Sequence, residues 1–270
     1  MATVPSKVAA RITAGIKQYQ PILNAARSRD VNEADTGVII TDMLGDVFGY
    51  DKYTEVTSEH AIRGTYCDRA VKIDGKVVLL VEVKAIGSEL KDGFIRQATD
   101  YAAKEGVDWV ILTNGIVWRV YKMLFAKPVE FETVLEFNFC EVSPKSDDNI
   151  ELLSLISKES WHKARLDEFE TKRQALNKFS LAALILGDAV LDVVRRELRR
   201  MSPGIKVDSE QISVVLQTEV IKREVLEGEK ADAARKFVAR AANRALRAST
   251  SEKEDGPTAE SDVGTANSSE

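Results

Sequence analysis

The chain contains little of what marks a secreted or membrane protein. Its 270 residues include only two cysteines, Cys67 and Cys140, and these form no repeated disulfide or metal spacing. No apolar run approaches the roughly 20 residues that a membrane span needs, and the first residues lack the apolar centre of a secretory leader. We therefore expect a cytoplasmic protein with reduced thiols and no membrane insertion.

The body of the chain also lacks net charge. The sequence has 38 basic and 43 acidic residues, a net charge of −5. Residues 250–270 alone hold six acidic residues and one basic residue, so the remaining 37 basic and 37 acidic residues balance. The acidic total therefore describes a tail, and it does not exclude a surface that binds nucleic acid.

The hydrophobic pattern of the first half changes period several times, which is typical of an α/β protein. Helices are expected first, then strands, then a further helix and further strands, and this order predicts a mixed sheet flanked by helices. The expected helices are 5–27, with Pro21 interrupting the pattern, 33–48, and 90–105, whose apolar face is Leu90, Phe94, Ile95, Ala98 and Ala102. The expected strands are 53–56, 64–73, 76–84, 109–113, 117–123 and 130–137.

Beyond Pro144 the strand signals disappear, and Leu, Ala, Glu, Lys and Arg dominate. Two helical runs are expected here, separated by Ser202-Pro203-Gly204, with Asp208 or Ser209 as the N-cap of the second. This change predicts an α/β domain over residues 1–145, an all-helical C-terminal module over residues 146–248, and a disordered acidic tail over residues 249–270.

The most informative stretch is a strand that ends in charged residues. Val77–Val81 has the nearly continuous apolar composition of a strand covered on both faces, and Glu82 and Lys84 follow directly. Since side chains alternate along a strand, Glu82 and Lys84 point to the same side. Charges at such a position are unfavourable unless they are paired or bind a metal.

Asp68 lies on the same face as Glu82 and Lys84 only if the hairpin has a loop with an odd number of residues or an equivalent bulge. A two-residue turn at Asp74-Gly75 pairs Ile73 with Lys76 and puts Asp68 on the face opposite to Glu82. A three-residue loop, with Gly75 in the left-handed position of a bulge, puts Asp68 and Glu82 on one face. We predict the three-residue loop. Two carboxylates and an ammonium at one strand end suit phosphodiester hydrolysis with Mg²⁺, or with Mn²⁺ in its place.

These residues resemble a known nuclease signature. Asp68 followed by Glu82-Val83-Lys84 is similar to the PD-(D/E)XK motif, and Gln97 with Tyr101 is similar to the QxxxY motif of the N-terminal nuclease domain of type I restriction enzyme R subunits. The segments 32–36, 48–50 and 112–121 resemble other parts of that domain, so the similarity covers residues 30 to about 140.

The resemblance implies a restriction-endonuclease-like fold and a role for each matching residue. Asp68, Glu82, Val83 and Glu33 would bind the metal, Lys84 would orient the attacking water, and Gln97 and Tyr101 would shape the site. Cys67 replaces a proline that many members have, which removes no ligand. The chain lacks a G-x-x-x-x-G-K-[ST] loop, so the DNA translocation of a complete R subunit does not carry over.

Each of these residues also has a simpler interpretation. Tyr101 can be a core residue and Gln97 can satisfy a backbone group, while Asp35 and Glu55 compete with Glu33 for its role. Two basic clusters of the helical module can hold phosphates or simply be solvated helix ends. They are Arg195, Arg196, Arg199 and Arg200, and then Arg235, Lys236, Arg240, Arg244 and Arg247.

The sequence thus predicts a Mg²⁺-dependent nuclease that acts on DNA, with restriction of foreign DNA as the role that the resemblance implies. An RNA substrate stays open, because no base-reading motif is present. The alternative is a non-catalytic nucleic-acid-binding or assembly protein that retains the nuclease fold. The helical module is the expected site for a protein partner or for homodimerisation.

Overall fold

The structure is a computed structural model that describes residues 4–62, 65–125 and 129–254. Its contacts divide the chain into two compact units, Met1–Glu170 and Thr171–Glu270. The division falls after the boundary near residue 145 that composition suggests, because the helices directly after the sheet pack with the first unit.

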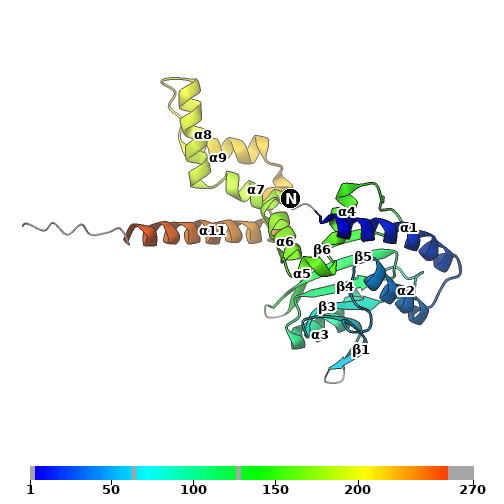
Figure 1. The fold of residues 1–270 in the computed structure, drawn as a ribbon. Helices are drawn as coiled ribbons and strands as arrows, with labels where there is room; N and C mark the ends of the chain where they lie inside the picture. Colours follow the sequence, from blue (N-terminus) through cyan, green and yellow to red (C-terminus); the bar gives the residue numbers. More distant parts are fainter. Residues whose placement is uncertain (1–3, 63–64, 126–128, 255–270) are drawn as a thin grey trace, which may run out of the picture. The chain divides into compact units, whose positions relative to one another are not determined.

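The first unit has the order of elements that the sequence predicts, as Figure 1 shows. Its helices are α1 (Ser6–Ser28), α2 (Glu33–Asp46), the 3-10 turn η1 (Asp92–Ile95), α3 (Arg96–Glu105), α4 (Asp147–Ser154), α5 (Lys158–Trp161) and the start of α6 (Arg165–Ala175). Its strands are β1 (Val56–Ile62), β2 (Thr65–Ile73), β3 (Lys76–Val83), β4 (Trp109–Thr113), β5 (Val117–Leu124) and β6 (Glu130–Asn138).

The six strands form one sheet in the order β1-β2-β3-β4-β5-β6. All neighbours are antiparallel except β3 and β4, which run parallel. A parallel pair needs a crossover connection, and the segment that contains η1 and α3 supplies it. The expected mixed sheet flanked by helices is therefore confirmed.

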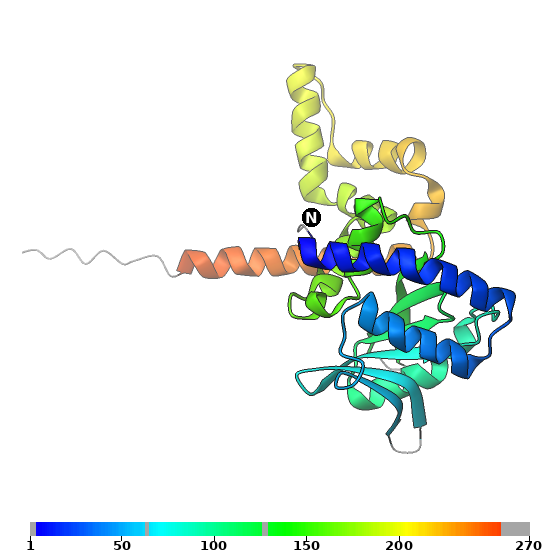
Figure 2. The same ribbon diagram turned by 45° about the vertical axis from the view of Figure 1, so that its right-hand side comes forward.

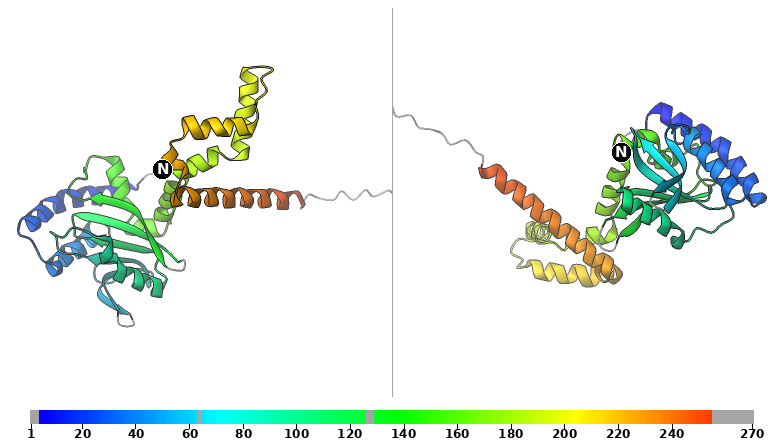
Figure 3. Two further views of the ribbon diagram at one scale, coloured as in Figure 1. Left: turned by 180° about the vertical axis from the view of Figure 1, so that it is seen from behind. Right: turned by 90° about the horizontal axis from the view of Figure 1, so that it is seen from below.

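Helices cover both faces of this sheet (Figures 1 to 3). On one face, buried residues of α1 and α2 such as Ile12, Ile16 and Ile40 form a large core with alternate strand residues. On the other face, Ala98 and Tyr101 of α3 pack on a smaller core. The central strands β3 and β4 are thus covered on both sides, as their apolar composition predicts.

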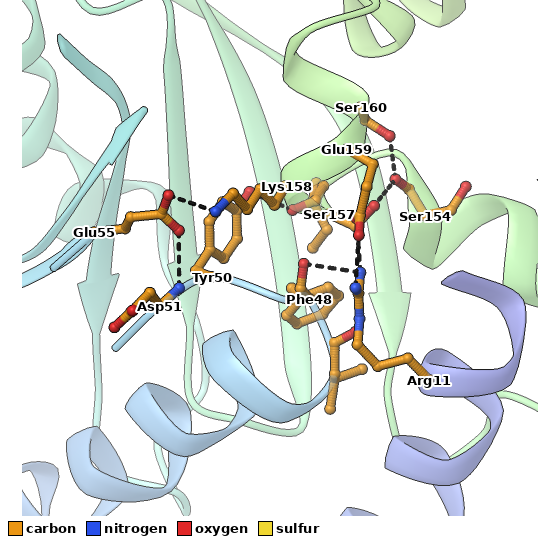
Figure 4. Close-up of polar contacts among 12 residues, drawn as sticks. Arg11, Phe48, Tyr50, Asp51, Glu55, Ser154, Ser157, Lys158, Glu159 and Ser160 are labelled. Atoms are coloured by element: carbon orange, nitrogen blue, oxygen red, sulfur yellow. Dashed lines mark hydrogen bonds and ion pairs between the residues drawn. The ribbon is translucent and has the colours of Figure 1, made fainter. Parts of the chain in front are cut away.

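Polar contacts attach α5 to the rest of the first unit (Figure 4). The Arg11 guanidinium donates to both carboxylate oxygens of Glu159, at 2.6 and 2.7 Å, and to the Phe48 carbonyl at 3.2 Å. Lys158 pairs with Glu55 at 2.6 Å. These contacts join α1 and the turn after α2 to α5, which explains why the first unit continues beyond the sheet.

Two predictions for the part of this unit before β1 are wrong. Pro21 does not interrupt the first helix, because α1 continues through it and the buried neighbours Tyr19 and Leu23 hold the helix on the core. The strand expected at residues 53–56 is a turn, and β1 begins at Val56. The Asp51 carboxylate accepts the backbone N–H groups of Tyr53, at 2.8 Å, and Thr54, at 3.2 Å, and so closes that turn.

The second unit is helical, as expected. Its elements after α6 are α7 (Lys178–Ile185), α8 (Asp188–Met201), α9 (Ser209–Val215), the π-turn η2 (Leu216–Val220), α10 (Arg223–Leu226) and α11 (Glu229–Glu254). Asp208 is the N-cap of α9 and forms a capping box with Gln211. Residues 249–254 continue α11, and the rest of the expected tail, 255–270, lies outside the described residues.

Within the described part of the chain, we find no helix that is both long and apolar enough to span a membrane.

Candidate active site at the end of strand β3

The hairpin between β2 and β3 begins with a two-residue turn. Ile73 pairs with Lys76, and both turn residues have positive φ, 49° at Asp74 and 78° at Gly75. These angles suit the primed turns that match the twist of a hairpin. The three-residue loop expected from the sequence is therefore wrong.

The extra residue is nevertheless present, within strand β3. Lys72 pairs with Val77, but Val71 pairs with Leu79, so Val78 forms a β-bulge with no partner in β2. The bulge has the same effect as the expected loop. One extra residue in β3 moves the side chains beyond it to the opposite face of the sheet, relative to their partners in β2. The predicted convergence of Asp68 and Glu82 thus depends on Val78 and not on the turn.

Beyond the bulge, Asp68 comes to lie beside the end of β3. Arg69 pairs with Val81, and continuing this register by one residue places Asp68 opposite Glu82. The Asp68 carboxylate also accepts the backbone N–H of Val83 at 2.7 Å. Asp68 is therefore fixed against the Glu82-Val83-Lys84 segment by a charge-assisted hydrogen bond.

Lys84 bridges two acidic residues that come from different elements. Its ammonium lies 2.8 Å from Glu82 Oε1 and 3.6 Å from Glu33 Oε2. Glu33 stands in the first turn of α2, where Asn32 caps the helix by accepting the N–H of Asp35. The structure thus brings the four charged residues Glu33, Asp68, Glu82 and Lys84 together from α2, β2 and the end of β3.

Burial separates these four residues into an inner and an outer part. The side chains of Glu82 and Lys84 are only 7% and 17% exposed, whereas that of Glu33 is 52% exposed. Glu82 and Lys84 therefore form a partly desolvated ion pair, in which each charge depends on the other. Glu33 lies at the solvent side, where its interaction with Lys84 is weaker.

The environment shifts the pKa of both members of the inner pair upwards. Burial raises the pKa of Glu82, the hydrogen bond from Lys84 opposes this, and the negative charge of Asp68 adds to the rise. For Lys84, burial lowers the pKa, but the hydrogen bond to Glu82 and the nearby carboxylates outweigh it and raise the pKa overall. A carboxyl with a raised pKa beside a second carboxylate is a common property of metal and catalytic sites.

The structure says less about the roles of the two residues of the expected QxxxY motif. Tyr101 is fully buried in the core beneath α3, and burial raises the pKa of its hydroxyl to about 12. The Gln97 backbone lies in α3, but its side chain lies outside the described residues. Tyr101 therefore anchors α3 on the smaller core, and the role of Gln97 stays a prediction.

Asn114, in the turn between β4 and β5, has a role in this region that sequence reasoning missed. Its buried carboxamide donates to the carbonyls of Ile86, at 3.3 Å, and Ser88, at 2.9 Å, and accepts the N–H groups of Ile116 and Val117. It thereby ties the β4–β5 turn to the loop that follows Lys84. The Asn-Gly pair gave no signal of this second, long-range role.

Arg69 is the other residue that sequence reasoning missed. Its guanidinium donates to Thr41 Oγ1 of α2 at 2.8 Å and to the Asp68 carbonyl at 2.6 Å. A Cβ atom added at Gly37 would stand 2.8 Å from Arg69 Nη2, so the absence of a side chain at Gly37 makes room for the guanidinium. Arg69 therefore holds α2, and with it Glu33, at a fixed distance from Asp68.

The donor set fits Mg²⁺ better than a metal that needs many protein ligands. Among the described residues, no group of three or more His, Cys, Asp or Glu side chains is arranged to hold a metal ion. Asp68, Glu82 and the backbone carbonyl of Val83 are hard oxygen donors at one strand end. Mg²⁺ typically binds to proteins through one or two carboxylates and keeps several waters.

The basic clusters of the helical module are partly engaged within the module. Arg195 pairs with Asp192 at 3.0 Å and Arg200 with Glu197 at 2.7 Å, while Arg199 donates to the Val207 carbonyl. In the second cluster, the side chains of Arg244 and Arg247 lie outside the described residues. Neither interpretation of these clusters is favoured by the contacts.

No protein-family model matches the chain, and no curated protein or solved structure matches it either.

Proposed function

We propose that the protein is a Mg²⁺-dependent nuclease that hydrolyses phosphodiester bonds of DNA at the site formed by Asp68, Glu82 and Lys84. One observation carries the proposal. The bulge at Val78 brings Asp68 level with Glu82, and Lys84 Nζ lies 2.8 Å from Glu82 in the same partly buried place. Hydrolysis of a phosphodiester needs oxygen ligands and a nearby cation in this combination.

Each residue has a defined task in this proposal. Asp68 and Glu82 would hold Mg²⁺ through carboxylate oxygens, and Val83 through its backbone carbonyl. The ion, when bound, would polarise the phosphoryl oxygen and lower the pKa of the attacking water. Once the metal neutralises Glu82, the Lys84 ammonium can turn to that water and to the developing negative charge.

The surrounding residues support this arrangement. Glu33 restrains Lys84 from the solvent side, and Arg69 keeps α2 in register with Asp68. Tyr101 and Gln97 would shape the site from α3. We propose a restriction-endonuclease-like fold on the basis of the motifs and the mixed sheet together. A role in restriction of foreign DNA follows only from the resemblance.

A cleavage assay on labelled DNA with and without Mg²⁺ tests the proposal. Lys84→Met, Glu82→Gln and Asp68→Asn are compared with Lys52→Met, which removes an exposed lysine that pairs with Asp42 at 2.9 Å outside the site. We expect each site variant to lose about 100-fold or more in rate, as the removal of a group that stabilises developing charge does, and the control to keep the wild-type rate. Metal-independent cleavage, or equal rates for wild type and Lys84→Met, would overturn the proposal.

DNA binding by the wild type without any cleavage would instead support the non-catalytic alternative.

A further inference from the structure

Phe94 departs from the position that the sequence predicts for it. The helical pattern of residues 90–105 places Phe94 on the buried face, together with Ile95 and Ala98. In the structure Ile95 and Ala98 are fully buried, but Phe94 is 37% exposed. The reason is that residues 92–95 form the 3-10 turn η1, which has three residues per turn and changes the phase of the face.

The exposed ring lies next to the candidate active site. Lys84 Nζ stands 5.6 Å from the centroid of the Phe94 ring, while it also contacts Glu82 at 2.8 Å. The ring is therefore an apolar surface directly beside the ammonium that we assign to the attacking water and the developing negative charge. The ammonium lies over the ring, in a cation–π contact that holds the aromatic side chain at the edge of the site while part of it stays exposed.

The segment around Phe94 leaves room for a ligand and contains two cations. Lys91 and Arg96, on either side of Phe94 in the sequence, are exposed, as is the acidic Glu89, and the segment also contains Asp92. A Cβ atom added at Gly93 would meet nothing within 4 Å, so the backbone next to the ring borders open space. Proteins bind unpaired bases and their phosphates by combining an exposed aromatic ring with nearby basic residues, and Phe94 has Lys84 at its ring.

We propose that Phe94 is a stacking platform for an unpaired base next to the scissile phosphate, so that the site prefers single-stranded nucleic acid to an intact duplex. The proposal rests on the nuclease function of the same site. Within a duplex, both faces of a base are covered by neighbouring bases, and only an unpaired base offers a free face to the ring. Every base has such a face, so this contact selects strandedness and not sequence.

The test measures binding and cleavage separately with the full-length protein. Binding of a short single-stranded oligonucleotide that contains 2-aminopurine is followed by fluorescence in Ca²⁺, which replaces Mg²⁺ to suppress cleavage. We expect Phe94→Leu, which keeps apolar bulk but removes the aromatic face, to weaken this binding by about 5- to 150-fold, the range for loss of one stacked base. Phe94→Trp should bind at least as tightly as the wild type, and duplex binding should change little in both variants.

Cleavage kinetics in Mg²⁺ distinguish stacking from a merely structural role. Stacking predicts that Phe94→Leu raises KM for single-stranded DNA and RNA and leaves kcat nearly unchanged. If the ring served only to hold Lys84 in place, the same variant would lower kcat on single strands and duplexes alike, and this result would overturn the proposal. Equal binding of single strands by wild type and Phe94→Leu would also overturn it.

Tyr53 provides a matched control. It is an exposed aromatic residue, and the ammonium of Lys52 lies 5.7 Å from the centroid of its ring. Tyr53 belongs to the turn before β1, outside the candidate site. Tyr53→Leu should leave single-strand binding unchanged. Weaker binding by Phe94→Leu in a protein that cleaves nothing would support stacking while refuting the nuclease function. Normal cleavage with unchanged binding would refute stacking alone.

Discussion

Replacing Lys84 by methionine tests whether the inner ion pair of the site is as tightly coupled as its geometry indicates. Methionine keeps the unbranched apolar stem that packs near Phe94 and removes only the charge. Glu82, whose side chain is 7% exposed, then loses the cation 2.8 Å away. Its carboxylate either stays charged without a partner or takes up a proton, and both outcomes cost stability.

The magnitude follows from the burial of the two residues. Removing one member of a buried pair typically costs about 3–5 kcal/mol. Lys84 keeps 17% of its side chain exposed, and water therefore screens part of the interaction. We expect Lys84→Met to lower the free energy of unfolding by about 2–3 kcal/mol at neutral pH in the absence of metal.

The effect should depend on pH with a definite sign. The pKa of Glu82 lies above its usual value of 4.5 in the folded protein, and loss of the Lys84 hydrogen bond raises it further. A carboxyl whose folded pKa lies above its unfolded pKa carries no penalty below about pH 4.5, where it is protonated in both states, and the penalty grows as the pH rises from there to the folded pKa. Lys84→Met should therefore lose less stability near pH 4.5 than near pH 7.

Urea unfolding of wild type, Lys84→Met, Glu82→Gln and the double variant gives the coupling energy of the pair. The double variant should recover most of the stability that Lys84→Met loses, because it no longer contains an unpaired carboxylate. A coupling energy below about 0.5 kcal/mol, the value for exposed pairs, would refute the claim that Glu82 and Lys84 form a desolvated pair. A loss that is independent of pH would refute the assignment of its cause to Glu82.

Three further variants test the framework around the site, each by urea or thermal unfolding. Gly75→Val forces a branched residue into φ 78° and should cost about 1–2 kcal/mol without changing metal binding, because the bulge at Val78 and not the turn sets the phase. Asn114→Ala removes four hydrogen bonds of a buried carboxamide and should cost about 2–4 kcal/mol, with faster amide exchange at Ser88, whose loop loses its tie. Tyr101→Ala empties a fully buried position and should cost about 3–5 kcal/mol. A cost well under about 1 kcal/mol for any of the three would contradict the structural role of the residue that was replaced.

Much of the sheet could be predicted because its strands have clear local signals. The strand 109–113 has the expected bounds, since Trp109–Leu112 is apolar and the Asn114-Gly115 turn follows Thr113. The strand after the Asp74-Gly75 turn begins at Lys76 as expected and ends at Val83, one residue before the expected end, and the residue types of the turn accommodate its positive φ angles. In both places the local preferences of the chain agree with the final packing.

The differences arise where a distant or subtle interaction decides the local structure. The bulge at Val78 has no sequence signature, because valine is equally suited to a regular strand. The carboxylate of Asp51 turns the β-prone Tyr53 and Thr54 away from an extended conformation. The 3-10 turn before α3 rotates Phe94 outwards.

The candidate site likewise combines residues that local patterns predict with residues that they do not. The alternation of Glu82 and Lys84 followed from strand geometry alone, and the structure agrees with it in their contact at 2.8 Å. The position of Asp68 depended on one residue of register, which the sequence located in the turn and the structure locates in the strand. Arg69 and Asn114 act through contacts with α2 and with the loop after β3, and no local pattern marks such contacts.

Mn²⁺ binding, measured by electron paramagnetic resonance, tests whether Asp68 and Glu82 hold a metal. The result does not depend on the choice of substrate. We expect a site in the wild type that Asp68→Asn and Glu82→Gln each abolish or weaken severely, and that Lys52→Met leaves intact. Its affinity should fall as the pH drops through the raised pKa of Glu82, since only the ionised carboxylate binds the metal. Mn²⁺ binding that is the same in wild type and both carboxylate variants would contradict a metal site at the end of β3.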